Sequence, residues 1–297
     1  MGLGLVLGLL ASVCWGVVDV AAAISTRRVG SSRVLAGTQL ISIVTLVALA
    51  LVRGDLLGPN PIGGFLAGFP LGAMASVIYL SQFMALRHGP VSIVSPVIVA
   101  YGGLTVILAV IFRGETLTPV QGVGAVLSTA GVILAAITFE GGSVRGVRLV
   151  GPGVIAAALA SIGFAVVTVL LAGPIGEHGW LPVIIGSRTG NTIFSFGILA
   201  LSLRGSRLRP LALPWHGWSR VAAAAILVSG LCDITGFVMF AFGLGVAPAW
   251  LMGLSTSFGP VLAIGWAMVH LGERLRPHQW AGVVALGVGV VALAVAG

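Results

Sequence analysis

The sequence contains no lysine, only two cysteines and few charged residues of any kind. Charged side chains make up 7% of the 297 residues, whereas hydrophobic residues make up 58%. A soluble domain of this length needs many more polar side chains to cover its core, so the composition excludes an ordinary soluble protein. The cysteines, Cys14 and Cys232, lie in apolar segments without a paired or metal-ligand spacing, which indicates neither a disulfide framework nor a metal centre.

The positive charge is carried entirely by arginine, and fifteen arginines against seven acidic residues give a net charge of +8. The arginines stand singly or in small groups at the edges of apolar segments, and no basic face interleaved with aromatic residues occurs. Basic residues in such positions are typical of the cytoplasmic loops of membrane proteins. A nucleic-acid partner is therefore not expected, and the lipid bilayer is the predicted surroundings of the chain.

Apolar stretches long enough to cross a bilayer follow one another along almost the whole chain. The hydrocarbon layer of about 30 Å is crossed by roughly 20 helical residues, and only helices or closed barrels satisfy the backbone there. The stretches lack the alternating polarity of barrel strands, so we expect an all-α membrane protein with about ten transmembrane helices. The expected spans are residues 2–24, 34–52, 62–86, 91–112, 119–138, 150–172, 183–203, 219–242, 247–271 and 277–296.

The two halves of the sequence repeat each other. At an offset of 158, G-E-T-L-T-P-V-Q from Gly114 lies over G-E-R-L-R-P-H-Q from Gly272. At an offset of 149, ASVCWGVVDV from Ala11 lies over ASIGFAVVTV from Ala160. We therefore divide the chain into a first five-helix repeat over residues 1–138, a linker over 139–149 and a second repeat over 150–297.

An odd number of spans in each copy turns the second repeat upside-down in the membrane relative to the first. Twelve arginines border the odd-numbered loops and only Arg53 and Arg113 border even-numbered ones, which predicts cytoplasmic odd loops and both termini outside. Inverted repeats can exchange conformations, so inward-open and outward-open states have similar energies. This property favours a transporter over an anchor or a scaffold.

Several short motifs resemble those of one transporter family. They are the turn A-L-R-H-G-P from Ala85 to Pro90, the following Ser95-Pro96, the G-E-x-L-x-x-x-Q segment in both halves, and Trp15-Gly16. Together they resemble the EamA-type branch of the drug/metabolite transporter superfamily. The resemblance implies two inverted five-helix repeats, a central cavity and alternating-access transport of metabolites or drugs. The basic residue expected early in the second helix of each repeat is present as Arg188 but replaced by Gln39 in the first half.

Three charged side chains, Asp19, Arg188 and Asp233, lie well inside expected spans, away from their ends. A charge there costs roughly 2.5–3.5 kcal/mol on insertion scales and needs a partner or a wet cavity. Arg188 has two open interpretations: its guanidinium binds an anionic group of the substrate, or it forms a fixed interhelical ion pair with an aspartate. Asp19 or Asp233 is a candidate for a proton-titrating site that couples transport to the proton gradient.

Other polar and aromatic side chains within the spans add to these three. Arg188 and Asn191 share a helical face, and Trp15 lies one turn from Asp19. Gln82, Ser95, Ser255 and Trp266 are further polar or aromatic residues in spans. The candidates for substrate binding or coupling are Trp15, Asp19, Gln39, Tyr79, Tyr101, Arg188, Asn191, Asp233 and Trp250.

Two pairs of equivalent residues are interpreted as structural. Glu115 and Glu273 precede Pro119 and Pro277, which suit the first position of a helix. A carboxylate in this place is expected to cap the N-terminus of the helix that follows it.

Gly64, Gly68 and Gly72, like Gly186 and Gly190, are spaced for close helix packing. Pro96 and Pro260 are expected to kink the fourth and ninth spans at similar depths.

The sequence thus predicts a secondary transporter that moves a small metabolite or drug across the plasma membrane, with protons as a candidate coupling ion. A passive channel is the alternative. A membrane enzyme is the remaining one, but Ser255 and His270 would lie on a single span, and no catalytic, metal or cofactor motif is present. Arginine without lysine beside abundant alanine, glycine and valine favours a bacterial source.

Overall fold

The computed structural model describes residues 2–58, 60–89, 91–136, 152–204, 219–259 and 277–295, and every regular element within these ranges is a helix. The first half contains α1 (Gly2–Val29), α2 (Ser31–Val52), the short 3₁₀ helix η1 (Gly54–Leu57), α3 (Pro61–His88), α4 (Val91–Val99), α5 (Tyr101–Arg113) and α6 (Pro119–Ala136). The second half contains α7 (Pro152–His178), α8 (Trp180–Leu203), α9 (Arg220–Val246), α10 (Ala249–Ser255), the 3₁₀ helix η6 (Thr256–Phe258) and α12 (Pro277–Val295).

Each of the ten stretches expected to span the membrane contains a described helix. Five of these helices, α1, α2, α3, α7 and α9, are long and apolar enough to cross a membrane on their own. Helix α8 has sufficient length with 24 residues, but Arg188 and Asn191 lower its hydropathy, and both side chains are buried against other helices. Leucine, isoleucine, valine and phenylalanine side chains are exposed along the outer faces of the bundle, as a lipid environment requires.

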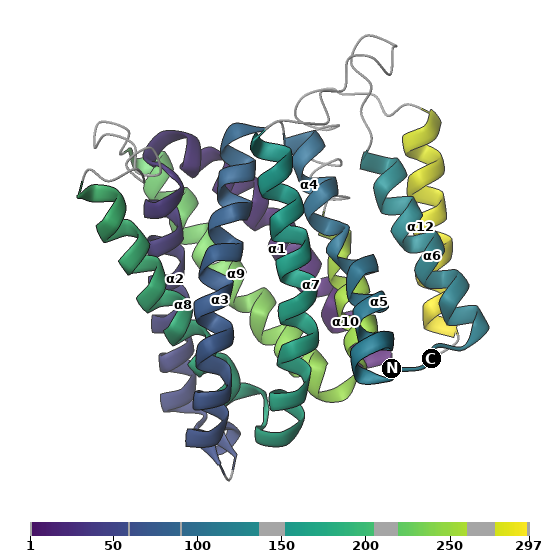
Figure 1. Cartoon of the computed structure of the whole chain (residues 1–297), viewed down its shortest axis with the longest axis horizontal. Helices are drawn as coiled ribbons and strands as arrows, with labels where there is room; N and C mark the ends of the chain where they lie inside the picture. Colours follow the sequence, from purple (N-terminus) through teal and green to yellow (C-terminus); the bar gives the residue numbers. More distant parts are fainter. Residues whose placement is uncertain are drawn as a thin grey trace.

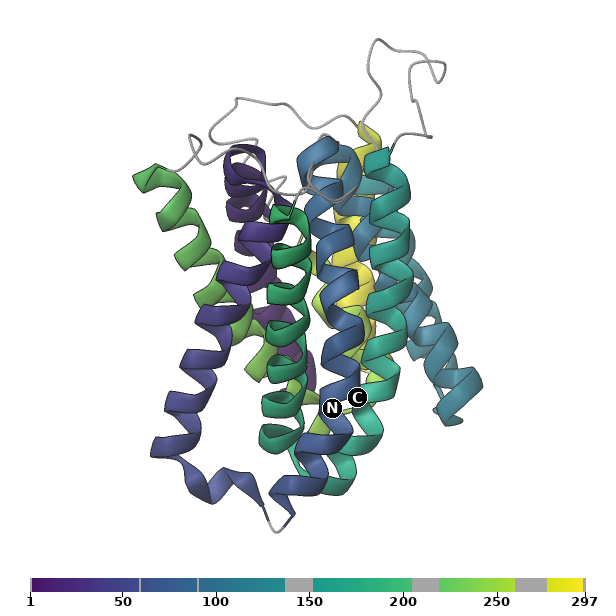
Figure 2. The ribbon, with the colours of Figure 1, turned by 60° about the vertical axis from the view of Figure 1, so that its left-hand side comes forward.

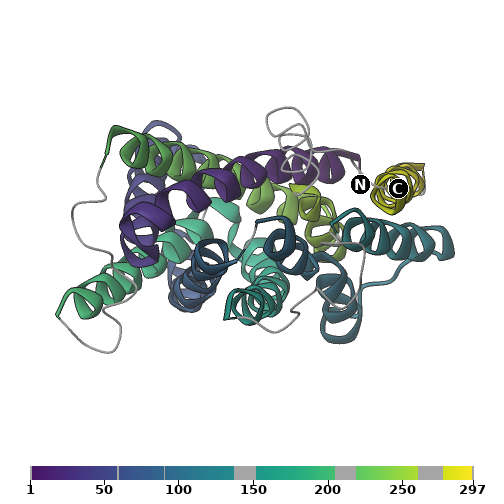
Figure 3. The same ribbon diagram turned by 90° about the horizontal axis from the view of Figure 1, so that it is seen from above.

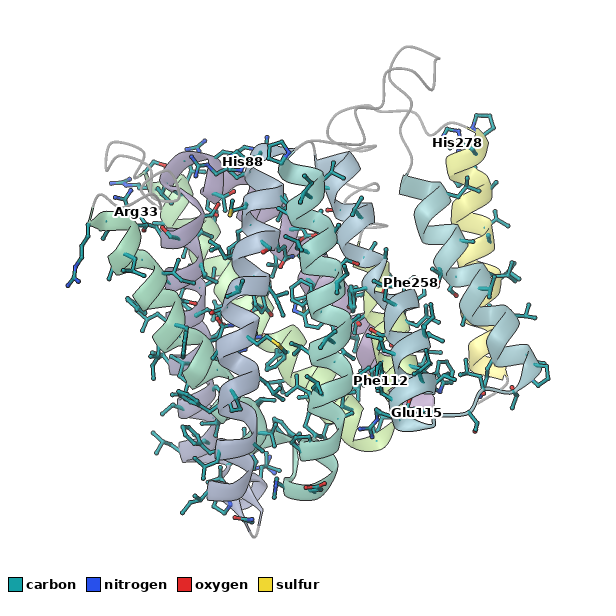
Figure 4. All side chains as sticks on the ribbon, in the orientation of Figure 1. Arg33, His88, Phe112, Glu115, Phe258 and His278 are labelled. Atoms are coloured by element: carbon teal, nitrogen blue, oxygen red, sulfur yellow. The ribbon has the colours of Figure 1, made fainter. Side chains whose placement is uncertain are left out.

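The two halves run in opposite directions through the bundle. His88 at the end of α3 and His278 at the start of α12 lie at one end, whereas Glu115, between α5 and α6, lies at the other (Figure 4). Helices α6 and α12 occupy equivalent places in the two repeats, pack side by side at one edge and point in opposite directions (Figure 1). Viewed from above, this pair lies at one edge of the bundle, with α12 beside the marks of both termini (Figure 3).

Helix packing follows the repeat. Helix α1 packs along α9 as its counterpart α7 packs along α3. The counterparts α2 and α8 contact each other, as do the counterparts α6 and α12. These pairs keep their neighbours when the two halves are exchanged, which is the arrangement expected of an inverted repeat. Most of the helices run close to one long axis of the bundle (Figure 2).

Apart from Arg188, which is buried within α8, the described arginines lie at the two ends of the bundle. Arg53 ends α2 and Arg113 ends α5, both at the end that carries Glu115. The arginines at the opposite end, which also carries His88, are Arg27, Arg28, Arg33, Arg87, Arg204 and Arg220. The helices therefore have the one-sided distribution of basic residues from which orientation in a membrane is predicted.

The fourth span is interrupted by a turn, and the ninth changes from α-helix to 3₁₀ helix at the equivalent position. Helix α4 ends at Val99 and α5 begins at Tyr101, with a turn at Ala100 between them. Helix α10 passes into the 3₁₀ helix η6 over Thr256–Phe258, and the offset of 158 relates Ala100 to Phe258. Pro96 lies within α4, as expected for a distorted helix, whereas Pro260 lies outside the described residues.

Glu115 caps a different helix from the one predicted, which was the helix that follows it. Its Oε1 accepts a hydrogen bond from the backbone N–H of Ala249 (3.1 Å), and its Oε2 accepts one from that of Trp250 (3.0 Å). Glu115 therefore caps α10 in the opposite repeat, while Arg113 Nε holds its Oε1 at 3.0 Å. Glu273 lies outside the described residues.

The start of α6 is capped instead by neighbouring side chains. The backbone N–H of Thr118 donates to Gln121 Oε1 at 2.8 Å, and that of Gln121 donates to Thr118 Oγ1 at 3.3 Å. This reciprocal pair is a capping box, and it leaves the Glu115 carboxylate available for α10. Pro119 and Pro277 are the first residues of α6 and α12, as predicted.

Glycines allow α3 and α8 to approach each other at the centre of the bundle. A Cβ on Gly68 would overlap the carbonyl oxygen of Val183, and one on Gly72 would overlap that of Ser187. From the other side, a Cβ on Gly186 would overlap the carbonyl oxygen of Phe65. The predicted role of these glycines in helix packing is confirmed. Because they have no side chains, the backbones of the two repeats can be in direct contact.

We predict that Gly72→Ala destabilises the protein, because the added methyl group meets a backbone carbonyl that has no rotamer to change. Overpacking of this kind costs about 1–3 kcal/mol. Thermal unfolding of the purified protein in detergent should show a lower Tm. Gly197→Ala is the matched control on α8, since a Cβ there meets nothing within 4 Å. Equal Tm values for the two variants would contradict the proposed close packing.

Candidate functional site

A cavity lies at the centre of the bundle where the two halves meet. Helices α1, α3 and α5 of the first repeat and α7, α8 and α9 of the second contribute to its walls. Its volume, measured over the centres of water-sized spheres, is about 80 Å³. One water molecule needs about 10–15 Å³ on this scale, so the cavity has room for a small solute or a few waters.

A buried ion pair forms one polar group of the cavity wall. Arg188 NH1 on α8 lies 2.8 Å from Asp233 Oδ2 on α9, and both side chains are at most 2% exposed. Tyr79 on α3 donates its hydroxyl to Asp233 Oδ1 at 3.0 Å and accepts a longer contact of 3.3 Å from Arg188 NH2. From α2, Ser42 donates to Asp233 Oδ2 at 3.2 Å, and Gln39 Oε1 accepts from Arg188 NH1 at 2.8 Å. The network joins four helices and both repeats.

The partners of Arg188 in the structure correspond to one of its two interpretations, the interhelical ion pair. Asp233 neutralises its charge, and the ring of Phe237 stacks against its guanidinium at 3.9 Å from Cζ to the ring centroid. Only its Nε lacks a hydrogen-bond partner among the described residues. The observed state is therefore the interhelical ion pair. An anion in the cavity would have to compete with a carboxylate already in contact.

Asp19 forms a second polar group with different partners. It is 6% exposed on α1, and its Oδ1 accepts a hydrogen bond from Gln82 Nε2 on α3 at 2.8 Å. Its Oδ2 accepts one from Ser95 Oγ on α4 at 3.2 Å. Both donors are neutral, so within the described part of the chain this carboxylate has no salt-bridge partner. The two aspartates thus occupy different electrostatic environments in one cavity.

Two rows of aromatic rings line the space between these polar groups. On one side Trp15 contacts Phe240 with centroids 5.6 Å apart, and Phe240 stacks on Phe237 at 6.1 Å. On the other side Phe164 lies 5.9 Å from Tyr101 and 5.3 Å from Tyr79. Such spacings are typical of packed aromatic pairs. The cavity is therefore mostly apolar, with polar side chains at a few fixed places.

The lining residues correspond across the repeat. At the offset of 149 the lining pairs are Trp15 and Phe164, Val18 and Val167, and Asp19 and Thr168. At the offset of 158 they are Ala75 and Asp233, Tyr79 and Phe237, Gln82 and Phe240, Ile98 and Thr256, and Tyr101 and Gly259. The two halves build the cavity from equivalent positions. The charged side chains break the symmetry, because the position equivalent to each of them in the other repeat is uncharged.

Comparison with known proteins agrees with this architecture. The EamA-like transporter family matches the chain twice, over residues 2–137 and 151–295. The chain belongs to the EamA-like transporter family. Like other members it is therefore a multi-pass membrane protein of the drug/metabolite transporter superfamily, with a transport role.

Solved structures support the fold of this EamA-like chain. Twenty-nine chains from solved structures match it, and one of them, titled only "Crystal structure of protein", has a TM-score of 0.72. The alignment has 20% sequence identity and covers 97% of this chain and 95% of the other. At this identity the match shows the fold alone. No curated protein sequence matches the chain.

Most of the residues predicted for the site of this EamA-like transporter line the cavity. They are Trp15, Asp19, Tyr79, Tyr101, Arg188, Asn191 and Asp233. Gln39 lies behind Arg188 as its hydrogen-bond acceptor, outside the lining. The Trp250 side chain is packed in the apolar core. Its backbone N–H donates a hydrogen bond to Glu115. The structure thus separates Trp250 from the cavity.

The cavity also contains residues that the sequence interpretation did not select. Gln82 lines the cavity, whereas Ser95 is outside the lining and donates to Asp19. Both are polar residues in expected spans, but nothing in their spacing indicates Asp19 as their partner. Phe164, Phe237 and Phe240 carried no signal, because phenylalanine is common in transmembrane helices. Thr256, whose Oγ1 is hydrogen-bonded to Tyr101, could have been found only from the pairing of α5 with η6.

Within the described ranges, no group of three or more His, Cys, Asp or Glu residues is placed to hold a metal ion. Ser255, considered above as a nucleophile, is buried and donates to the carbonyl oxygen of Met252 at 3.3 Å. His270 lies outside the described residues.

We predict that Arg188→Met strongly destabilises the fold, because Asp233 is left as an uncompensated buried charge. Loss of one partner of a buried pair costs about 3–5 kcal/mol. The double variant Arg188→Met with Asp233→Asn removes both charges and should recover most of the stability. Denaturant unfolding in detergent followed by circular dichroism measures both changes. A double variant no more stable than Arg188→Met would contradict the pairing.

Proposed function

We propose that this chain is a secondary transporter that moves a small metabolite or drug across the plasma membrane by alternating access. The observation that carries the proposal is the central cavity, whose walls come from equivalent positions of two oppositely oriented repeats. A binding site placed at the interface of inverted repeats can be exposed to either side when the repeats exchange conformations. The cavity needs no rebuilding between the two states.

The interrupted helices supply places where such a change can occur. Val99 and Tyr101, on either side of the Ala100 turn, line the cavity, as do Thr256 and Gly259 around η6. Irregular backbone in membrane helices is tolerated where it faces a cavity or packed protein, and it absorbs changes of direction. In our proposal the two breaks bend in opposite senses as access alternates.

The Arg-bearing end of the bundle faces the cytoplasm in this proposal, and both termini lie outside. The six described arginines at that end, against two at the other, support this orientation. The composition rich in arginine, alanine, glycine and valine supports a bacterial plasma membrane as the location.

Coupling to protons is assigned to Asp19 in the same proposal. Asp233 is committed to Arg188, whereas the hydrogen bonds that reach Asp19 come from neutral Gln82 and Ser95. In the part of the chain that the structure describes, the other titratable groups that line the cavity are Tyr79, Tyr101 and the Arg188–Asp233 pair. A carboxylate that holds a proton in one state and the solute in the other links export of the solute to proton entry.

We expect proteoliposomes containing the purified protein to show saturable counterflow of at least one member of a panel of amino acids, sugars, nucleosides and cationic drugs. A carrier exchanges labelled for unlabelled solute, whereas a channel only lets the label equilibrate. Protein-free liposomes are the control. Flux that fails to saturate would favour the channel, and a lack of exchange across the whole panel would contradict transport of these classes.

We further expect a pH gradient to drive solute accumulation by the wild type, and Asp19→Asn to reduce it to the passive level. Asparagine keeps the shape of the side chain but cannot exchange a proton. Ser161→Ala is the control, because Ser161 is a buried hydroxyl that does not line the cavity. Gradient-driven accumulation by Asp19→Asn equal to that of the wild type would remove Asp19 from the coupling step.

A further inference from the structure

The region around Asp19 offers hydrogen-bond acceptors without matching donors. An ionised carboxylate has about four acceptor sites, and Asp19 uses two of them for Gln82 Nε2 and Ser95 Oγ. Gln82 uses its Nε2 to donate to the carboxylate, and its Oε1 is buried without a donor among the described residues. Gln82 Oε1 therefore remains unsatisfied beside a carboxylate that can accept further hydrogen bonds, and an unsatisfied buried group in a native structure calls for a ligand or a water.

The same part of the cavity carries an uncompensated negative charge. Among the described residues, the charged ones in the lining are Asp19, Arg188 and Asp233, and the last two neutralise each other at 2.8 Å. Asp19 therefore leaves the lining with one net negative charge when it is ionised. A lone charge is costly in a site of low polarity, and a cation restores neutrality.

Aromatic rings next to Asp19 suit a cation with an apolar body. Trp15 lies one helical turn before Asp19, and Trp15 and Tyr101 both line the cavity. A cation over an aromatic face is stabilised by the ring quadrupole, and this cavity already contains one example in Arg188 over Phe237. The remaining rings, including Phe164 and Phe240, provide an apolar surface for the rest of a ligand.

We propose that Asp19 and Gln82 Oε1 bind the primary ammonium group of the transported solute, and that the solute is a small amine with an apolar or aromatic body. This assignment rests on the proposed transport function and adds the class of substrate to it. A primary ammonium has three N–H donors and one positive charge, which match two acceptors and one negative charge. The equivalent positions in the other repeat, Thr168 and Phe240, lack the charge, so the amine has a single binding end.

The geometry also selects against two related classes of solute. A quaternary ammonium has the charge but no N–H group, so it leaves the Gln82 oxygen without a donor. An organic anion meets Asp19 with a like charge, and its natural partner, Arg188, is already held by Asp233. A loss of one hydrogen bond to a charged group lowers affinity by roughly tenfold or more.

Equilibrium binding of radiolabelled phenethylammonium to the purified full-length protein in detergent tests this inference. The competitors are unlabelled phenethylammonium, 2-phenylethanol, 3-phenylpropionate and trimethyl(2-phenylethyl)ammonium, which share one ring and differ in the polar group. We expect phenethylammonium to compete at least about tenfold better than each of the other three. Equal competition by the trimethyl compound, stronger competition by the acid, or no binding of the label to folded protein would each overturn the proposal.

Two substitutions and one control separate recognition from folding. Asp19→Asn should abolish measurable binding, and Gln82→Met should weaken phenethylammonium by about tenfold while weakening the trimethyl compound less. Ser161→Ala removes another buried polar atom that has no partner, outside the cavity lining, and should bind as the wild type does. Thermal unfolding confirms that each variant is folded. A folded Asp19→Asn variant that binds the amine normally would overturn the assignment.

The outcome for the amine and the outcome for transport can be distinguished. Counterflow of phenethylammonium in proteoliposomes is measured beside the binding assay. Selective binding without exchange would retain the amine site but contradict the carrier. Exchange of a sugar, nucleoside or acid without any binding of phenethylammonium would retain the carrier and overturn the amine assignment.

Discussion

A guanidinium buried in the middle of a membrane protein has to be neutralised, and most of the central structure follows from how Arg188 meets this need. Asp233 provides the countercharge from α9, Gln39 and Ser42 approach from α2, and Tyr79 approaches from α3. Each of these helices must lie at a fixed depth and rotation for its side chain to reach the pair. The ion pair therefore sets the register between the two repeats, and the cavity beside it inherits its shape from that register.

Close helix approach makes this network possible. Gly68 and Gly72 bring α3 into backbone contact with the part of α8 that carries Ser187 and Arg188. A larger residue at either glycine would push the two helices apart and lengthen the contacts between Tyr79 and the ion pair. The packing of small residues and the burial of charge thus depend on each other. Without the glycines, α3 and α8 could not come close enough for their polar side chains to form these contacts.

The sequence was sufficient for the fold class and for the positions of the helices because apolar length and internal repetition are local properties that can be read along the chain. It was also sufficient to find Asp19, Arg188 and Asp233, since charges within apolar spans are conspicuous. It could not pair them, because a partner such as Gln82 for Asp19 depends on how three helices rotate against one another. The division at residues 138 and 150, the count of ten spans and the roles of the site residues stay predictions.

The cap formed by Glu115 illustrates the same limit at the ends of the helices. Its position just before Pro119 favoured a cap on α6, since a carboxylate beside a helix start normally serves that helix. The capping box of Thr118 and Gln121 already satisfies the first N–H groups of α6, and the inverted partner repeat brings the start of α10 within reach of Glu115. Local reasoning fails here because the better partner is 134 residues away in the chain.

The asymmetry between Gln39 and Arg188 has a physical reason that also bears on the rest of the cavity. The two residues are equivalent at the offset of 149, and they touch each other where α2 meets α8. A second arginine at position 39 would place two buried guanidinium groups in contact with only Asp233 to neutralise them. An acceptor such as glutamine removes the repulsion and accepts a hydrogen bond from Arg188.

Positions near the axis that relates two repeats lie next to their own counterparts, so a charge can be kept there only in one copy. Inverted repeats can therefore share the shape of a site between them while its charges have to be divided unequally, and a site built in this way binds its ligand in one orientation.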